Sequence, residues 1–232
     1  MKKIKLKVKN KKIEAPGVST IFFSPPKSFQ YHSGQFIDVY FPEIAGEQGK
    51  SYSLSSSPVE NFFSITVKAI GGFSNHLRAL KKGGILLSSE PYGFFFSESR
   101  DSHLVMLAGG IGVAPFRSII LEELSCNPNR KISLFYSSRT KNDIIFNEEL
   151  DLWQGKYKNL KVIHFLTREK KVDEGKEKGR ITTEKILKEI FDLENLEFLI
   201  CGSIDFVRDM RKGLRRGGVP EEAIYTEAFF SH

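Results

Sequence analysis

The chain has 232 residues, which is the length of one large domain or of two domains of ordinary size. Hydrophobic residues make up 40% of it, so it can form buried cores, but no stretch approaches the roughly 20 apolar residues that span a bilayer. The net charge is +7, and most of it lies in residues 1–98, which carry 13 Lys+Arg against 7 Asp+Glu. The lysine-rich start has no apolar segment typical of a secretory signal.

Two cysteines and five scattered histidines give no metal-ligand spacing, so the sequence predicts no metal site. The scarcity of cysteine is typical of a reducing compartment, and we expect a cytoplasmic protein.

The first predicted element is a half-buried strand over Lys3–Glu14, because lysines alternate there with apolar residues. Lysines on the outer face of a strand favour solubility and discourage edge-to-edge pairing. A nucleic-acid surface is the disfavoured alternative, since no aromatic stacking motif accompanies the lysines.

Short strands and turns continue to residue 98. Further strands are predicted at Val18–Phe23, Phe36–Phe41, Tyr52–Leu54, Phe63–Ile70 and Ile85–Ser88, with one helical piece at Ser74–Lys81. Many short strands separated by Gly, Pro, Asn and Ser are typical of an antiparallel β-barrel.

Strands and helices alternate from about residue 101, which predicts a doubly wound α/β domain with a parallel sheet. The expected strands are His103–Ala108, Ile132–Tyr136, Leu160–Leu166, Glu197–Cys201 and Ala223–Ala228. The expected helices are Pro115–Leu124, Asp143–Leu152, Thr182–Phe191 and Ile204–Arg215. The charged segment Glu169–Lys178 is predicted as a mobile loop. We therefore expect two domains, residues 1–98 and 99–232.

A glycine cluster follows the apolar run Leu104–Ala108, in the order Gly109-Gly110-Ile111-Gly112, and Pro115 then opens a helix. Strand, glycine turn and helix is the context in which a dinucleotide pyrophosphate binds, because glycine allows close backbone approach and the helix start attracts anions. Proline is tolerated in the first helical turn. The alternative is a tight connection without a ligand.

Two stretches of the first 98 residues are candidates for binding a second cofactor. One is Lys50-Ser51-Tyr52-Ser53, which as an isolated pattern is also compatible with a polar barrel turn. The other runs from Val67 to Ser74, where a strand ends in Gly71-Gly72. We expect Ser74 to cap the following helix, whose start is suited to a phosphate group.

Together these stretches resemble the ferredoxin–NADP⁺ reductase family of flavoprotein oxidoreductases over nearly the whole chain. The flavin motif Arg-x-Tyr-Ser/Thr corresponds to Lys50–Ser53, and Gly-x-x-Ser corresponds to Gly71–Ser74. The nicotinamide motif Gly-Gly-x-Gly-x-x-Pro corresponds to Gly109–Pro115. The family's Cys-Gly and Glu-x-Phe motifs correspond to Cys201-Gly202 and to Glu227-Ala228-Phe229.

The resemblance implies an FAD site in the first domain, with FMN as the alternative. Tyr52 is expected to stack on the flavin ring, Ser53 to hydrogen-bond near N5, and Phe229 to cover the other face. Lys50 replaces the family's arginine, so we expect weaker flavin retention, because lysine lacks the bidentate fork. The full set of implied FAD residues is Lys50, Ser51, Tyr52, Ser53, Val67, Lys68, Gly72, Phe73, Ser74 and Phe229.

The resemblance also implies a nicotinamide site in the second domain. Its expected residues are Gly109, Gly110, Ile111, Gly112, Pro115, Ser138, Arg139, Cys201 and Gly202. Ser53, Cys201 and Glu227 are the residues expected at the reacting atoms. From the residues alone, Cys201 is equally compatible with a buried strand end, and a terminal Phe-Phe with a core plug.

The nucleotide is predicted to be NADPH rather than NADH, because no acid follows the strand at Ile132–Tyr136 before Asp143. Ser138 and Arg139 suit a 2′-phosphate, with Arg168 and Arg180 as weaker candidates. Arg139 stacked on adenine, or simply solvated, is the alternative.

The predicted function is an NAD(P)H-dependent flavoprotein reductase that passes electrons to a separate acceptor, such as ferredoxin or another iron–sulfur or haem protein. Two cysteines cannot ligate a four-cysteine cluster, so the acceptor is expected to be another molecule. The alternatives are a reductase of free flavin and a non-catalytic electron-transfer subunit. The oligomeric state is not predicted.

Overall fold

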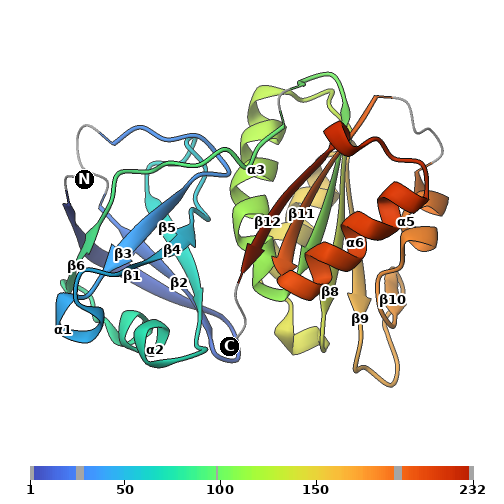
Figure 1. Cartoon of the computed structure of the whole chain (residues 1–232). Helices are drawn as coiled ribbons and strands as arrows, with labels where there is room; N and C mark the ends of the chain where they lie inside the picture. The colour runs from blue at the N-terminus through green and yellow to red at the C-terminus, as the bar shows by residue number, and fades with distance from the viewer. Residues whose placement is uncertain (1–2, 25–28, 98, 191–194, 230–232) are drawn as a thin grey trace. The chain divides into compact units, whose positions relative to one another are not determined.

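A computed structural model describes residues 3–24, 29–97, 99–190 and 195–229 (Figure 1). The chain divides into two compact units. The first unit comprises residues up to Phe94 together with Ala114–Glu122, and the second comprises Phe95–Val113 and the chain from Glu123 onward.

The first unit is built on a six-stranded antiparallel sheet with the order β4-β3-β6-β1-β2-β5. The strands are β1 (Ile4–Ala15), β2 (Val18–Phe23), β3 (Phe36–Tyr40), β4 (Gly49–Ser53), β5 (Phe63–Lys68) and β6 (Ile85–Ser88). They match the strands predicted from the sequence to within about three residues at each end, as expected for boundaries read from patterns.

Alternation along β1 separates a buried face from a charged one. Leu6 and Val8 are buried in the core of this unit, whereas Lys5, Lys7 and Lys9 are exposed. The N-terminal part of β1 pairs with β6 and the remainder pairs with β2, with an irregularity in register between Val8 and Asn10. The long strand therefore links two parts of the sheet, and bulges of this kind allow a strand to bend.

The predicted barrel is only partly closed. The sheet order ends at β4 on one side and β5 on the other, and one isolated bridge, Leu54 to Ile65, joins the two ends among the described residues. The fold class is confirmed, but a fully hydrogen-bonded barrel is not what forms. Leu54 and Ile65 are both fully buried, so side-chain packing fills the barrel where the ladder of backbone bonds is short.

Two helices lie between these strands: α1 (Pro42–Ala45), which the sequence patterns missed, and α2 (Gly72–Ala79). The predicted helix start at Ser74 is wrong by two residues, because Gly71 occupies the N-cap position and Ser74 lies within the first turn.

The second unit contains a six-stranded parallel sheet with the order β10-β9-β8-β7-β11-β12. The strands are β7 (His103–Gly109), β8 (Ile132–Ser138), β9 (Leu160–Leu166), β10 (Lys176–Lys178), β11 (Leu196–Ser203) and β12 (Ile224–Phe229). The first strand along the chain, β7, lies between β8 and β11, as in a doubly wound sheet.

Helices cover both faces of this sheet, which confirms the predicted α/β class. On one face, α5 (Thr183–Glu189) and α6 (Ile204–Arg216) bury Ile186, Val207 and Met210 against Val105 and Ile200 (Figure 1). On the other face, α4 (Asn147–Lys156) is preceded by Ile145, whose backbone N–H donates to the buried Tyr136 hydroxyl at 3.2 Å. The remaining long helix, α3 (Val113–Cys126), follows β7.

Several boundaries in the second unit differ from the sequence-based expectation. The loop predicted at Glu169–Lys178 contains β10, which pairs in parallel with β9. Helix α4 begins at Asn147 because a separate turn, η2 (Lys141–Asp143), precedes it. Phe191, the predicted end of the next helix, lies outside the described residues, and α5 ends at Glu189. Every helix within the described ranges falls short of the length and apolarity needed to cross a bilayer.

Candidate functional site

An aromatic pair in the first unit brings together three of the predicted flavin residues. The rings of Tyr52 on β4 and Phe73 on α2 lie nearly parallel, with centroids 6.5 Å apart and planes 16° apart. The Nζ of Lys50 lies 5.5 Å from the centroid of Phe73. Burial raises the pKa of Tyr52 to about 12, so its ring is neutral at physiological pH. A flat aromatic surface beside a cation fits a planar ring that carries phosphate.

The two serines of this stretch lie on the opposite side of β4, because successive strand residues alternate. The hydroxyl of Ser51 donates to Asp38 Oδ1 at 2.6 Å, and Tyr92 donates to Asp38 Oδ2 at 2.6 Å. Burial and this hydrogen bond raise the pKa of Tyr92 to about 12. Ser53 is buried. Asp38 therefore ties β4 to the turn at Tyr92, a role that the sequence patterns did not indicate.

The turn from β5 into α2 places the other predicted flavin residues. Val67 is buried and Lys68 half-buried at the end of β5. The Oγ of Ser74 accepts from the backbone N–H of Ile70 at 2.9 Å and of Gly71 at 3.1 Å. The prediction that Ser74 is the N-cap is thus wrong in position, but its hydroxyl does satisfy backbone groups at this helix start.

Space at the start of α2 is compatible with a ligand. A Cβ added at Gly71 or Gly72 would meet no described heavy atom within 4 Å. Packing within the described protein therefore does not require glycine at either position, whereas close approach of a phosphate to the backbone would. The aromatic pair, the cation and this open helix start together fit an FAD molecule.

The glycine turn of the second unit is packed tightly on β11. Gly110 has φ +55°, a left-handed conformation that favours glycine. A Cβ added at Gly112 would overlap the carbonyl group of Cys201 and lie 2.8 Å from the backbone nitrogen of Gly202. Helix α3 starts at Val113, so Pro115 is its third residue rather than its first. The turn, η1 (Gly110–Gly112), thus packs against the strand end at Cys201-Gly202.

Cys201 and Glu227 occupy paired positions on adjacent strands. The parallel register of β11 and β12 places Cys201 beside Glu227 and Ser203 beside Phe229. Cys201 is fully buried, and burial followed by the charge of Glu227 raises the pKa of its thiol well above the ordinary value. A protonated thiol is a packing group rather than a nucleophile. Phe229 is half-buried, and the neighbouring Phe230 lies outside the described residues.

The predicted 2′-phosphate residues lie at the carboxyl end of β8. Ser138 is buried and Arg139 is exposed. The backbone N–H of Arg168 donates to the carbonyl of Arg139 at 2.8 Å, which places these two arginines on adjacent connections. Asp143 is already engaged, because it accepts from the hydroxyl of Thr140 at 2.6 Å.

Acids also occur at this edge, on the segment after β9. Glu169 accepts from the backbone N–H of Lys141 at 2.9 Å, and Asp173 pairs with the side chain of Lys141 at 2.7 Å. The sequence pattern missed them because it considered only the residues that directly follow β8.

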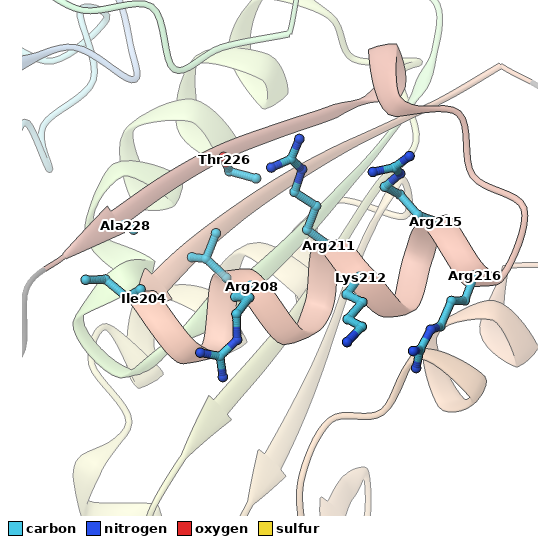
Figure 2. Close-up of a pocket in the computed structure, with 9 residues that line it drawn as sticks. Ile204, Arg208, Arg211, Lys212, Arg215, Arg216, Thr226 and Ala228 are labelled. Atoms are coloured by element: carbon cyan, nitrogen blue, oxygen red, sulfur yellow. The ribbon is translucent and has the colours of Figure 1, made fainter.

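A groove of about 620 Å³ lies between α6 and β12 (Figure 2). Thr226 and Ala228 line it, and none of the predicted site residues does so. Figure 2 shows Arg211 and Arg215 extending toward β12, and both form ion pairs with Glu221. Two of the groove's arginines are thus paired with an acid of the same unit, and we assign the groove no part in the candidate site.

A buried ion pair that the patterns did not predict joins α3 to the loop after β4. Arg117 is 6% exposed and forms two hydrogen bonds with the carboxylate of Glu60. A charged residue inside the apolar run Val113–Leu121 was the available signal for Arg117, but its partner lies 57 residues away. Within the described ranges, no group of three or more His, Cys, Asp or Glu side chains could hold a metal ion.

Comparisons with known sequences agree with these features. Residues 106–212 match the family of oxidoreductase NAD-binding domains. The chain is 30% identical to the gamma subunit of sulfhydrogenase 2 from Pyrococcus furiosus, with 76% of this chain and 64% of that protein covered. It is 29% identical to the ferredoxin reductase component of 3-ketosteroid-9-alpha-monooxygenase from Mycobacterium tuberculosis, with 89% and 57% covered. The chain spans about three fifths of the length of the curated relatives it matches.

Solved structures share the fold over almost the whole chain. A ferredoxin NADP⁺ reductase from Neisseria gonorrhoeae, with bound FAD and NADP, superposes with a TM-score of 0.86 at 25% identity, covering 99% of this chain and 100% of that one. The flavohem-like FAD/NAD binding domain of a nitric oxide dioxygenase from Vibrio cholerae gives 0.86 at 23% identity, covering 97% and 98%. The second likeness concerns the fold alone.

Proposed function

We propose that the chain is an NAD(P)H-dependent FAD oxidoreductase of the ferredoxin–NADP⁺ reductase-like type, serving a separate electron acceptor. The observation that carries the proposal is the presence of both half-sites in one chain. The first unit holds the aromatic pair Tyr52 and Phe73, and the second holds the glycine turn packed on Cys201. Residues 1–98 are the proposed flavin domain and residues 99–232 the nicotinamide domain.

The proposed flavin residues act by orientation and charge. Tyr52 and Phe73 offer a flat surface that fixes the plane of the ring, and Lys50 supplies a cation for phosphate. The backbone at Gly72 leaves space for a phosphate, and the N–H groups at the start of α2 can donate hydrogen bonds to it. Ser51, Ser53, Val67, Lys68, Ser74 and Phe229 complete the proposed flavin site.

Bound FAD supplies a two-electron acceptor that can release its electrons singly, which no side chain provides. Orientation of the nicotinamide, rather than acid–base chemistry, is the main task left to the protein. Gly109, Gly110, Ile111, Gly112 and Pro115 form the proposed pyrophosphate turn. Cys201 and Gly202 border the nicotinamide, and the neutral thiol excludes water there without introducing charge.

NADPH is the proposed nucleotide. Arg139 is exposed at the carboxyl end of β8, and Ser138 precedes it. An arginine fork suits a phosphate dianion, whereas a ribose hydroxyl calls for a carboxylate. Asp143, the acid that follows on the same connection, already accepts hydrogen bonds from the backbone N–H and the hydroxyl of Thr140.

The proposed acceptor is a ferredoxin or another iron–sulfur or haem protein. One relative is described as a ferredoxin reductase component and another as a monooxygenase electron transfer component. These names support a chain that donates electrons to a partner. Both cysteines are free in the structure, and we keep a reducing, cytoplasmic compartment as part of the proposal.

An anaerobic titration with NADPH and then NADH, followed through the visible flavin spectrum, tests this function. A yellow protein bleached stoichiometrically by NADPH and slowly by NADH is the expected result. Equal bleaching by both nucleotides would keep the reductase but remove the role of Arg139. A yellow protein that responds to neither nucleotide would contradict the reductase and favour an electron-transfer subunit.

Reduction of free flavin is a second candidate function, and Lys50 is the observation that favours it. Lysine gives a point charge where an arginine would grip phosphate with two hydrogen bonds. Purification as a colourless protein that reduces added FAD or FMN in many turnovers would select this candidate over a flavoprotein with bound cofactor.

A further inference from the structure

The buried pair Arg117–Glu60 belongs to none of the motifs that define the candidate site. Nη1 and Nη2 of Arg117 donate to the two carboxylate oxygens of Glu60 at 2.9 and 3.0 Å. Nη1 also donates to the carbonyl of Ser55 at 2.7 Å. The side chains are only 7% and 14% exposed. Both partners and Ser55 lie in the first compact unit.

The next residue on α3 adds a second attachment to the same unit. The Oγ of Ser118 lies 2.6 Å from the carbonyl oxygen of Ser56 and 2.9 Å from the Oγ of Ser33. The backbone N–H of Ser57 donates to Glu60 at 2.8 Å. The loop from Ser55 to Glu60 directly follows β4 and its bridge at Leu54, so it continues the strand that carries Tyr52.

Arg117 lies in the first turns of the helix that follows the glycine turn. Helix α3 begins at Val113, immediately after Gly112. A planar guanidinium held by a fork of two bonds fixes direction as well as distance, so the pair sets the rotation of α3 about its axis. Rotation of a helix changes where its first backbone N–H groups point, and these groups are the ones offered to an anion.

Stability alone does not account for an ion pair in this position. Removal of two charges from water is costly, and apolar residues of similar volume often stabilise a protein as well or better. What an apolar pair cannot supply is a fixed direction. We propose that Arg117 and Glu60 are positioning residues for nicotinamide binding, in that they fix the rotation of α3 through the loop that follows the flavin strand. This inference rests on the proposed function.

The test is the double variant Arg117→Met/Glu60→Met, which removes both charges and leaves neither partner buried alone. We expect its dissociation constant for NADP⁺, measured by titration calorimetry, to rise about ten-fold as the helix start loses its fixed direction. FAD content is expected to stay at the wild-type value, while the midpoint of thermal unfolding is expected to fall, because the Ser55 carbonyl and the Ser57 N–H lose these partners. Arg117→Lys keeps the charge without the fork, and we expect it to bind NADP⁺ about three-fold more weakly.

The matched control is Lys161→Met/Glu189→Met, which removes an exposed pair with side chains 57% and 43% accessible. It is expected to bind NADP⁺ as the wild type does. NADP⁺ affinity within two-fold of wild type in the folded double variant would overturn the proposal, as would a parallel loss of FAD and NADP⁺. If the double variant does not fold, an unchanged affinity in Arg117→Lys overturns it. Failure of the wild type to bind either nucleotide would instead contradict the proposed function itself.

Discussion

In the proposed flavin site, Lys50 is the side chain that supplies a cation for the phosphate. The Nζ of Lys50 lies over the ring of Phe73, and the backbone of Lys50 on β4 pairs with Val39 on β3. The sheet therefore fixes the backbone from which the Lys50 side chain extends, while the ammonium group is a single, strongly hydrated point charge. The motif that Lys50–Ser53 resembles has arginine at this position, and an arginine would bind phosphate through two parallel bonds.

We predict that Lys50→Arg tightens FAD binding about ten-fold, because a bidentate fork replaces a single charge. The measurement is the dissociation constant of FAD from the quenching of its fluorescence in the apoprotein. Lys7→Arg, an exposed lysine of β1, is the control for the general effect of an added guanidinium. An unchanged constant for Lys50→Arg would remove Lys50 from the phosphate contact.

Arg139 carries the nucleotide preference in our proposal. We predict that Arg139→Gln lowers kcat/KM for NADPH about ten-fold and leaves that for NADH within two-fold, because only the 2′-phosphate needs the guanidinium. Steady-state reduction of a neutral quinone with each nucleotide measures both values. Equal losses with the two nucleotides would point instead to stacking of Arg139 on adenine.

His164 is a buried titratable residue outside the candidate site. It is 4% exposed, and neither ring nitrogen has a hydrogen-bond partner among the described atoms. Burial lowers its pKa from 6.5 to about 4, while Asp151 acts in the opposite direction and Lys176 in the same one. The unfolded chain therefore binds a proton between these two values and the folded chain does not. The stabilisation is present above pH 6.5 and is lost as pH falls toward 4.

We predict that the second unit is about 2 kcal/mol less stable at pH 5 than at pH 7.5 because of His164. Urea unfolding followed by the fluorescence of Trp153, the single tryptophan and a residue of α4, measures this at both pH values. His164→Leu is expected to remove that difference, and His76→Gln, at a half-buried position in the first unit, to retain it. Persistence of the full difference in His164→Leu would assign it to other groups.

At the scale of elements, two glycines differ in whether the surrounding structure requires the absence of a side chain. Gly112 lets η1 meet the carbonyl group of Cys201 on β11, whereas Gly155 lies within α4 and a Cβ there would meet no described atom within 4 Å. Glycine in an open helical position costs backbone entropy without a packing benefit. The same substitution should therefore have opposite effects at the two places.

We predict that Gly112→Ala destabilises the protein by about 3 kcal/mol or more, because the new Cβ overlaps backbone that cannot move like a side chain. Gly155→Ala is predicted to stabilise it by about 0.5–1 kcal/mol. Chemical unfolding of both variants beside the wild type measures the two values. Tolerance of Gly112→Ala would show that β11 and the turn separate easily.

Element type was readable from the sequence where patterns are local. Alternation along β1 predicts which of its residues are buried, and so does the apolar run Leu104–Ala108. The short strand β10 was missed because charged residues surround it and because its pairing with β9 leaves no signal in the local sequence. The start of α2 was misplaced because Gly71 holds the N-cap position without a side chain.

Residues of the candidate site that lie in one contiguous motif could be predicted from the sequence, whereas contacts between residues far apart in the chain could not. Lys50–Ser53 and Gly109–Gly112 are single stretches whose geometry follows from one strand or one turn. Arg117 and Glu60 are 57 residues apart, and Asp38 meets Ser51 and Tyr92 only once β3 has paired with β4 and with the turn at Tyr92. One sequence gives no way to match such partners before the sheet order is known.

At the scale of the whole molecule, the net charge of +7 bears on partners rather than on the fold. We predict that reduction of an acidic ferredoxin slows about ten-fold between about 50 mM and about 500 mM salt, because screening weakens attraction before contact. Reduction of a neutral quinone in the same series is the control and should change less than two-fold. A ferredoxin rate independent of salt would exclude electrostatic steering.

The strand order of the second unit also constrains how the chain is made. β7 is the first of its strands to leave the ribosome, yet it lies between β8 and β11, and β11 does not begin until Leu196. One edge of a strand with an apolar, buried middle therefore stays unpaired through the synthesis of more than eighty further residues. The first unit likewise lacks Ala114–Glu122 until its own strands have long been made. We therefore expect the exposed edge of β7 to need protection from wrong pairing until β11 has been made.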